Sequence, residues 1–108
     1  MNKSVKSVVR IFFWSLIAVF LSACASPKWS QEIEQGQRYY ERGYYKQSFH
    51  ELLAPAAAGR PQAQYAIGYM YYYGYGVSQD TATGIFWIRK AADQHYKPAG
   101  KALAEIER

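Results

Sequence analysis

Residues 63–92 constrain the fold most, because they combine two amphipathic helical segments with a glycine-rich break between them. The first segment has small and apolar residues at helical spacing, which places them on one face. These residues are Ala63, Ala66, Ile67 and Met70. Gly74 and Gly76 then interrupt the helix and permit a turn that needs positive φ angles. The stretch therefore predicts a helix–turn–helix hairpin.

Gly68 lies inside the first helix of this hairpin, where glycine costs about 1 kcal/mol relative to alanine. A glycine kept at that cost usually lets another helix approach closely, so we expect a helix crossing at Gly68. Asp80 is a good N-cap for the second helix. The apolar face of that helix is formed by Ile85, Ile88 and Ala92, with Trp87 and Ala91 beside it. Met70 and Ile88 are then expected to share the interior of the hairpin.

The same stretch resembles a Sel1-like repeat, a longer-looped relative of the tetratricopeptide repeat. The matching positions are Ala63, Tyr65, Ile67, Gly68, Met70, Tyr71, Gly74, Gly76, Val77, Asp80, Trp87, Lys90, Ala91 and Ala92. Gly84 and His95 depart from the pattern, which usually has alanine and a helix-ending glycine there, and both are expected to weaken helix stability. The resemblance implies a protein-binding scaffold with no chemistry of its own.

The chain also repeats with a period near 36 residues, which is typical of a helical array. The pairs at this offset are Phe49 and Ile85, Leu52 and Ile88, Ala56 and Ala92, Ala63 and Ala99, Ala66 and Ala102, and Ile67 and Leu103. The first repeat is a degenerate copy with a tighter, tetratricopeptide-like turn at residues 43–45. We therefore predict an all-α fold over residues 30–108: a short helical-repeat solenoid of about two helix–turn–helix hairpins plus a C-terminal capping helix at residues 98–108.

The first hairpin has weaker signals than the second. Ser30 can cap a helix that runs to about Arg42, and Pro61 suits the start of the third helix. The helix between them should be kinked by Pro55. Its expected apolar face is formed by Phe49, Leu52, Leu53, Ala56 and Ala57. Arrays of this kind usually need about three repeats for stability, so we expect a stabilising partner or self-association.

Residues 1–23 have the features of a bacterial lipoprotein signal peptide. A positive region contains Lys3, Lys6 and Arg10, and residues 11–21 form an apolar run that is shorter than the roughly 20 residues needed to span a bilayer. The junction at residues 21–24, Leu-Ser-Ala-Cys, resembles a lipobox. The resemblance implies that Cys24 becomes the lipidated first residue of the mature protein, followed by a tether over residues 24–29.

The alternative for Cys24 is a free or buried thiol near a plain membrane anchor. Cys24 is the only cysteine, so a disulfide within the chain is impossible and a metal site would have to form without thiolates.

The formal net charge of +5 overstates how basic the folded part is. Three of the 13 Lys and Arg residues lie in the leader, whereas all eight Asp and Glu residues follow it, so the mature excess falls to +2. Basic residues beyond the leader form nothing larger than a pair such as Arg89-Lys90. We therefore expect no nucleic-acid partner.

The ionisable residues argue against an enzyme. The two histidines, His50 and His95, do not have the spacing of a helical metal pair. Four acidic residues lie in pairs two apart on expected helices, so the members of each pair point to different sides. These pairs are Glu32 with Glu34 and Glu105 with Glu107. A cell-wall glycan hydrolase would need a matched acid and base, so we expect no catalytic residue, metal or cofactor.

Eleven tyrosines are more than a small helical core needs. Tyr72, Tyr73 and Tyr75 lie near the expected exposed turn, and we predict that they contact a partner, because tyrosine offers a large contact area and a hydroxyl group. The alternative is that these three rings shield the end of the hairpin.

Tyr65 and Tyr69 lie on the helix that precedes this turn. Because array helices bury two faces, we expect these two side chains to be part of the scaffold. Their expected neighbours are Tyr39, Tyr40 and the helix that carries Phe49.

Together these patterns predict a membrane-anchored periplasmic lipoprotein that acts as a protein–protein interaction scaffold, as an accessory part of an envelope assembly. Its partner would be an unidentified protein or peptide, and its lipid would hold it in the outer membrane, since Ala25 after Cys24 resembles an outer-membrane sorting signal. The alternative is a surface-exposed or secreted virulence-type lipoprotein that binds host molecules. Digestion by protease on intact cells would favour this alternative.

The lipid anchor is directly testable. We expect Cys24→Ala to abolish lipidation and to leave an uncleaved or soluble form, because the change removes the side chain that the lipobox resemblance implies to be lipidated. Mass spectrometry of the mature N-terminus measures the outcome. An unmodified Cys24 in wild-type protein extracted from membranes would contradict the prediction.

Overall fold

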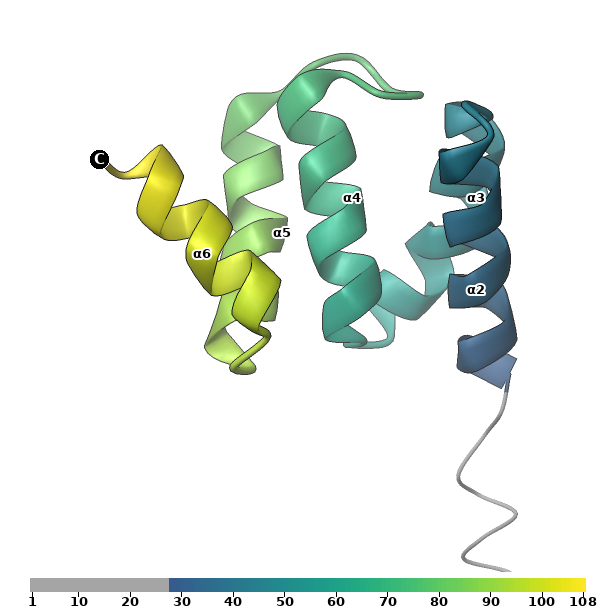
Figure 1. The fold of residues 1–108 in the computed structure, drawn as a ribbon, viewed down its shortest axis with the longest axis horizontal. Coiled ribbons are helices and arrows are strands. Elements are labelled where there is room, and N and C mark those ends of the chain that lie inside the picture. The colour runs from purple at the N-terminus through teal and green to yellow at the C-terminus, as the bar shows by residue number, and fades with distance from the viewer. Residues whose placement is uncertain (1–27) are drawn as a thin grey trace, which may run out of the picture.

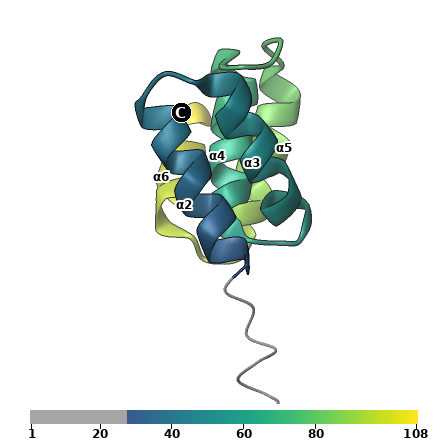
Figure 2. The same cartoon turned by 90° about the vertical axis from the view of Figure 1, so that its right-hand side faces the viewer.

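The computed structural model describes residues 28–108. The helices of this part are α2 (Lys28–Glu41), α3 (Tyr45–Ala57), α4 (Pro61–Tyr73), α5 (Thr81–Asp93) and α6 (Lys97–Ile106). They stand next to one another in chain order, and each packs mainly on the helix before and after it (Figure 1). Figure 2 shows α2 and α6 on one side of the array, α3 and α5 on the other, and α4 between them. The predicted all-α helical-repeat fold is confirmed.

Residues 1–27, which include the expected leader, Cys24 and most of the tether, lie outside the described part. Within residues 28–108, no helix has the length and apolarity needed to cross a bilayer.

The repeat of the sequence is also a repeat of the structure. Helix α5 begins 36 residues after α3, and α6 begins 36 residues after α4. Helices α3 and α5 each have 13 residues. The α2–α3 connection is the shorter turn that the sequence predicts, and it contains Gly43 at φ 80°.

The α4–α5 loop begins with the expected glycine turn and ends with the expected N-cap of α5. Gly74 ends α4 in the left-handed conformation, at φ 76°, which glycine adopts without strain from a Cβ atom. Asp80 caps α5: the Thr83 backbone N–H donates to Asp80 Oδ1 at 3.0 Å, and the Thr83 hydroxyl donates to Oδ2 at 2.7 Å. These hydrogen bonds, the side-chain bond first, lower the pKa of Asp80 because they favour the carboxylate.

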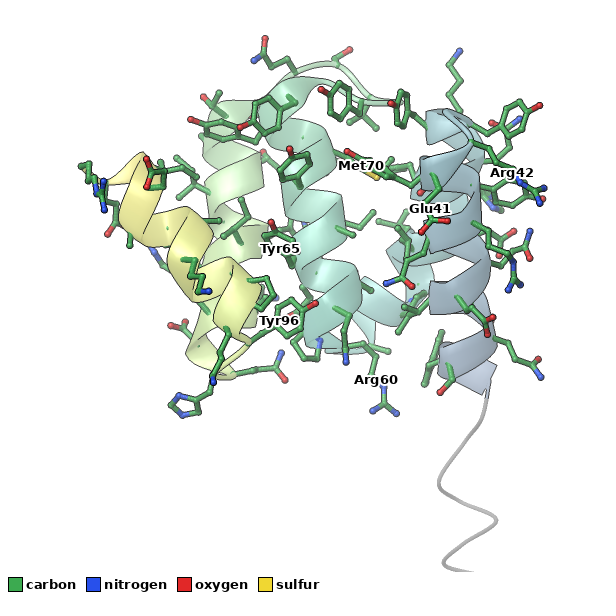
Figure 3. The ribbon with its side chains drawn as sticks, in the orientation of Figure 1. Glu41, Arg42, Arg60, Tyr65, Met70 and Tyr96 are labelled. Carbon is green, nitrogen blue, oxygen red and sulfur yellow. The ribbon has the colours of Figure 1, made fainter. Side chains whose placement is uncertain are left out.

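Two apolar clusters hold the array together. The first joins α3 and α4 through Leu52, Ala56, Ala63, Ile67 and Met70. The second joins α5 and α6 through Ile88, Ala91 and Ala99. The expectation that Met70 and Ile88 share one interior is therefore wrong in detail: both are buried, but Met70 faces the first hairpin, as Figure 3 shows.

Helices α4 and α5 meet backbone to backbone at a pair of glycines. A Cβ atom added to Gly68 would lie 2.7 Å from the Gly84 carbonyl oxygen, and one added to Gly84 would lie 2.8 Å from the Gly68 carbonyl oxygen. The predicted crossing at Gly68 is confirmed. It also explains the departure at Gly84, because an alanine there would clash with α4 and the cost in helix propensity is offset by close packing.

The buried face of helix α3 is rotated from the predicted one: Leu52 and Ala56 are buried as expected and Phe49 is half-buried, but two other members of the predicted face are not. Leu53 is 42% exposed and Ala57 is exposed, whereas Ser48 and Pro55 are buried. The Ser48 hydroxyl donates to the Gly36 carbonyl oxygen of α2 at 2.8 Å, which satisfies this buried polar group. Because Ser48 is polar, a prediction based on the pattern of apolar residues does not assign it to the buried face.

The glycine crossing predicts opposite effects for two glycine-to-alanine changes. Gly68→Ala should lower the free energy of unfolding by about 1–3 kcal/mol, because the added methyl group overpacks the contact with Gly84 and Ile88. Gly100→Ala on α6, where an added Cβ meets nothing within 4 Å, should raise it by about 0.4–1 kcal/mol. Chemical denaturation of both variants measures the difference; equal stability would refute the proposed crossing.

Candidate partner-binding groove

An open groove of about 520 Å³ crosses the face that α2, α4 and the start of α6 form. Its lining consists of Gln37, Tyr40, Glu41, Leu52, Gln62, Tyr65, Ala66, Tyr69 and Tyr96. In Figure 3, Glu41 lies between α2 and α4, and Tyr65 and Tyr96 lie toward α6. Ligand pockets in proteins commonly measure roughly 300–1,000 Å³, so the groove is large enough to hold part of a ligand.

Helical spacing places the groove tyrosines together. Tyr65 and Tyr69 are one turn apart on α4, and their ring centroids are 6.1 Å apart. Tyr40 comes from the last turn of α2. Tyr96 occupies the N-cap position of α6, and its ring centroid lies 5.8 Å from that of Tyr65. Three segments that are distant in the sequence therefore contribute to one aromatic surface.

Tyr75 of the α4–α5 loop connects this surface to the first hairpin. Its ring stacks on that of Tyr45 with centroids 4.9 Å apart and an interplanar angle of 17°. The loop comes this close because Gly76 touches the Tyr45 backbone, where an added Cβ would lie 2.6 Å from the carbonyl carbon. The ring contacts form one series, in the order Tyr96, Tyr65, Tyr69, Tyr75 and Tyr40.

Tyr40, Tyr65 and Tyr69 of the groove are uncharged at neutral pH. Burial, followed by the neighbouring phenols, raises the pKa of Tyr40 to about 12. Burial also raises the pKa of Tyr65 and of Tyr69. Among the described residues that line the groove, Glu41 is therefore the one that carries a charge. The groove offers aromatic faces, hydroxyl groups, amides and one carboxylate.

The buried amide of Gln64 and the exposed amide of Gln94 support the start of α4, next to the groove. Gln64, which is 4% exposed, donates from Nε2 to the Ala56 carbonyl oxygen at 3.3 Å. Gln94 Nε2 donates to Gln64 Oε1 at 2.8 Å and to the Gly59 carbonyl oxygen at 2.9 Å. These bonds tie the α3–α4 turn to the end of α5, and so hold the start of α4 in place. The sequence reading did not single out either glutamine, because single polar residues carry no periodic signal.

The three tyrosines that the sequence predicts as partner contacts touch through their rings, with Tyr73 next to both Tyr72 and Tyr75, but they differ in burial. Tyr73 is 49% exposed, whereas Tyr75 is half-buried and packs against the first apolar cluster. Tyr72 and Tyr73 line a second, smaller depression of about 190 Å³ between α4 and α6. Their role in partner binding stays a prediction, but Tyr75 has a structural role in addition.

Tyr65 packs differently from the sequence-based expectation, whereas Tyr69 lies near Tyr40, one of its expected neighbours. Tyr65 packs against the second apolar cluster and Tyr96, not against the helix of Phe49. The Phe49 ring instead makes an edge contact with Tyr71, with centroids 5.4 Å apart. The side of α4 that carries Tyr65 and Tyr69 therefore remains accessible along the groove.

The histidines do not form a site. His50 and His95 are both exposed. His95 has a left-handed backbone at φ 62°, which explains why a glycine is usual in the repeat pattern at this position. Within the described part of the chain, no three His, Cys, Asp or Glu residues are grouped closely enough to hold a metal ion.

The family model of the Sel1 repeat matches residues 61–96. Residues 61–96 are a Sel1 repeat. The repeat runs from the first residue of α4 to the residue before α6, so it contributes most of the tyrosines of the groove. Sel1 repeats generally mediate protein–protein interactions.

The chain is also similar to Uncharacterized protein NMB1327 of Neisseria meningitidis serogroup B, with 43% identity over 51 residues. The match covers 47% of this chain but 11% of that protein, so the likeness concerns one part of a much longer relative. No solved structure matches the chain.

The difference in burial predicts that Tyr75 of the α4–α5 loop and Tyr73 at the end of α4 differ in their effect on stability. Tyr75→Ala should lower the thermal midpoint clearly, since it removes a stacked ring that packs on the first cluster, and large aromatic truncations cost about 3–5 kcal/mol when the site is fully buried. Tyr73→Ala should change the midpoint little, because that side chain is about half exposed. Circular dichroism melting compares them, and equal midpoints would contradict the assignment of Tyr75 as a packing residue.

Proposed function

We propose that this protein is a lipoprotein anchored in the outer membrane that binds a protein partner in the tyrosine-lined groove. It would face the periplasm and serve as an accessory part of an envelope assembly. The observation that carries the binding role is the groove itself, an accessible aromatic surface built on a Sel1 repeat. Interfaces are enriched in tyrosine, and a few aromatic anchors supply most of their binding energy.

The proposed anchor is supported by the sequence of the leader and by the direction of α2. Helix α2 begins at Lys28, at the end of the array that lies opposite the α4–α5 loop (Figure 1). Lipidation at Cys24 would leave a short tether before this helix. The end of the array that carries the α4–α5 loop would then point away from the attachment site and remain available to a partner.

The role that we propose is binding without catalysis. The groove presents a single carboxylate and phenols that stay protonated at neutral pH. An acid–base mechanism would require a second group with a matched pKa beside Glu41. Binding needs only the shape and the aromatic surface that the groove already has.

Site-specific photo-crosslinking tests this proposal in cells. A photoreactive amino acid is placed at Gln37 or Gln62, two exposed positions that line the groove, and at Gln47 on α3, an exposed position outside it. We expect one membrane-associated protein to be cross-linked from the groove positions and at least about tenfold less from the control. The three substitutions replace the same residue type, so they differ only in location.

The result that would refute the proposal is equally specific. Cross-linking from Gln47 at the level of the groove positions would place the partner elsewhere on the array. The proposal would also be refuted if no protein were cross-linked from Gln37 or Gln62 while these variants remain folded and membrane-bound.

A further inference from the structure

The groove carries a negative charge, although the chain as a whole has more basic than acidic residues. Glu41 is the charged member of the lining, alongside the neutral amides of Gln37 and Gln62. In Figure 3, Arg42 and Arg60 both point away from the groove. The lining contains no Lys or Arg of the described residues, so the charge that the groove itself carries is that of Glu41.

Glu41 also lies where its own helix does not stabilise it. It is the last residue of α2, at the negative end of the helix dipole, where a carboxylate is unfavourable. Among the ion pairs of residues 28–108, Glu34 pairs with Arg38, Glu107 with Arg89 and Glu105 with Arg108, and Glu41 takes part in none of them. A carboxylate in this position is well suited to a cation supplied from outside.

The tyrosine rings provide a second attraction for a cation. The side chains of Tyr40, Tyr65 and Tyr69 line the same groove as Glu41. A Lys or Arg side chain gains from both contacts, because its alkyl stem packs on aromatic rings while its charge interacts with the ring faces and with a carboxylate. These phenols are neutral at neutral pH, and burial raises their pKa further, so they do not compete with Glu41 for the cation.

We propose that the groove recognises an extended segment of the partner protein through a Lys or Arg side chain, which lies on the groove tyrosines with its charge near Glu41. This inference rests on the proposed function, since it specifies the chemistry of the segment that the same groove would bind. It excludes acidic segments, which would bring a second negative charge next to Glu41 without a compensating cation. A glycan that stacks on the rings would have no need of the carboxylate's charge.

Selection from a library of random peptides tests the chemistry of the groove. The full chain, purified in detergent, is used to select binders from displayed 12-residue peptides, a length of about 40 Å when extended. We expect enrichment of Lys or Arg at one position of the binders, and loss of that enrichment when Glu41→Lys is used instead. The peptide that binds best is then synthesised with its basic residue and with methionine in its place.

A double-mutant cycle isolates the expected charge pair. Glu41→Gln should weaken the basic peptide by roughly two- to fivefold, the usual range for an exposed ion pair, and should leave the methionine peptide unchanged. Glu34→Gln is the matched control: it makes the same charge change on the same helix, outside the groove, and should affect neither peptide. Affinity for the basic peptide should also fall as salt is added.

Two kinds of failure are distinguishable. Weaker binding of the selected peptides to folded Tyr69→Ala protein would show that they bind in the groove. If such peptides lack a basic preference, or prefer Asp and Glu, this inference is overturned and the proposed function remains intact. Peptides that bind equally well to Tyr69→Ala protein, or cell-wall glycan fragments that bind in their place, would overturn both.

Discussion

The contact between Gly68 and Gly84 is the constraint on which the rest of the structure depends. Because no side chain separates α4 from α5 at this point, the rotation of α4 about its own axis is fixed. With Gly68 against α5, the side that carries Ile67 and Met70 must face α3. The tyrosines at positions 65 and 69 are then left on the third side of the helix, along the groove. One pair of glycines therefore determines both what α4 buries and what it offers to a partner.

The two apolar clusters show how a short array remains folded. Each helix packs mainly on its sequence neighbours, so stability is built up from local contacts between successive helices. The α4–α5 loop adds a longer connection, since Gly76 and Tyr75 bring the second repeat back onto Tyr45 at the start of α3. The hydrogen bonds of Gln64 do the same at the opposite end of α4. Helix α4 is thus held at both of its ends as well as at its centre.

The sequence was sufficient for the fold because its strongest signals are local. Helical periodicity, the Asp80 cap and the glycines of the loop depend on neighbouring residues, and the 36-residue period relates the two repeats. The direction in which Met70 packs, the exposure of Leu53 and the burial of Ser48 depend on how helices rotate against one another. That rotation is set by contacts between residues far apart in the chain, which periodicity within one helix does not report.

The same reasoning applies to the candidate groove. Tyrosine abundance pointed to an aromatic surface, and the sequence placed its centre at the loop, on Tyr72, Tyr73 and Tyr75. The structure adds Tyr40 and Tyr96, which come from α2 and the start of α6 and meet the α4 tyrosines only in the folded array. That these tyrosines lie together, and that Glu41 lies beside them without an ion-pair partner among the described residues, could be seen only from the arrangement of α2, α4 and α6.

The series of touching rings has a consequence for the entropy of recognition. A free tyrosine samples several rotamers, and fixing a flexible side chain at an interface costs about 0.5–1.5 kcal/mol. Here Tyr65, Tyr69 and Tyr75 already restrict one another through ring contacts. Most of that ordering occurs during folding, so the surface is preorganised and loses little freedom when a ligand arrives. A groove of modest size can then bind selectively without a large rearrangement of the array.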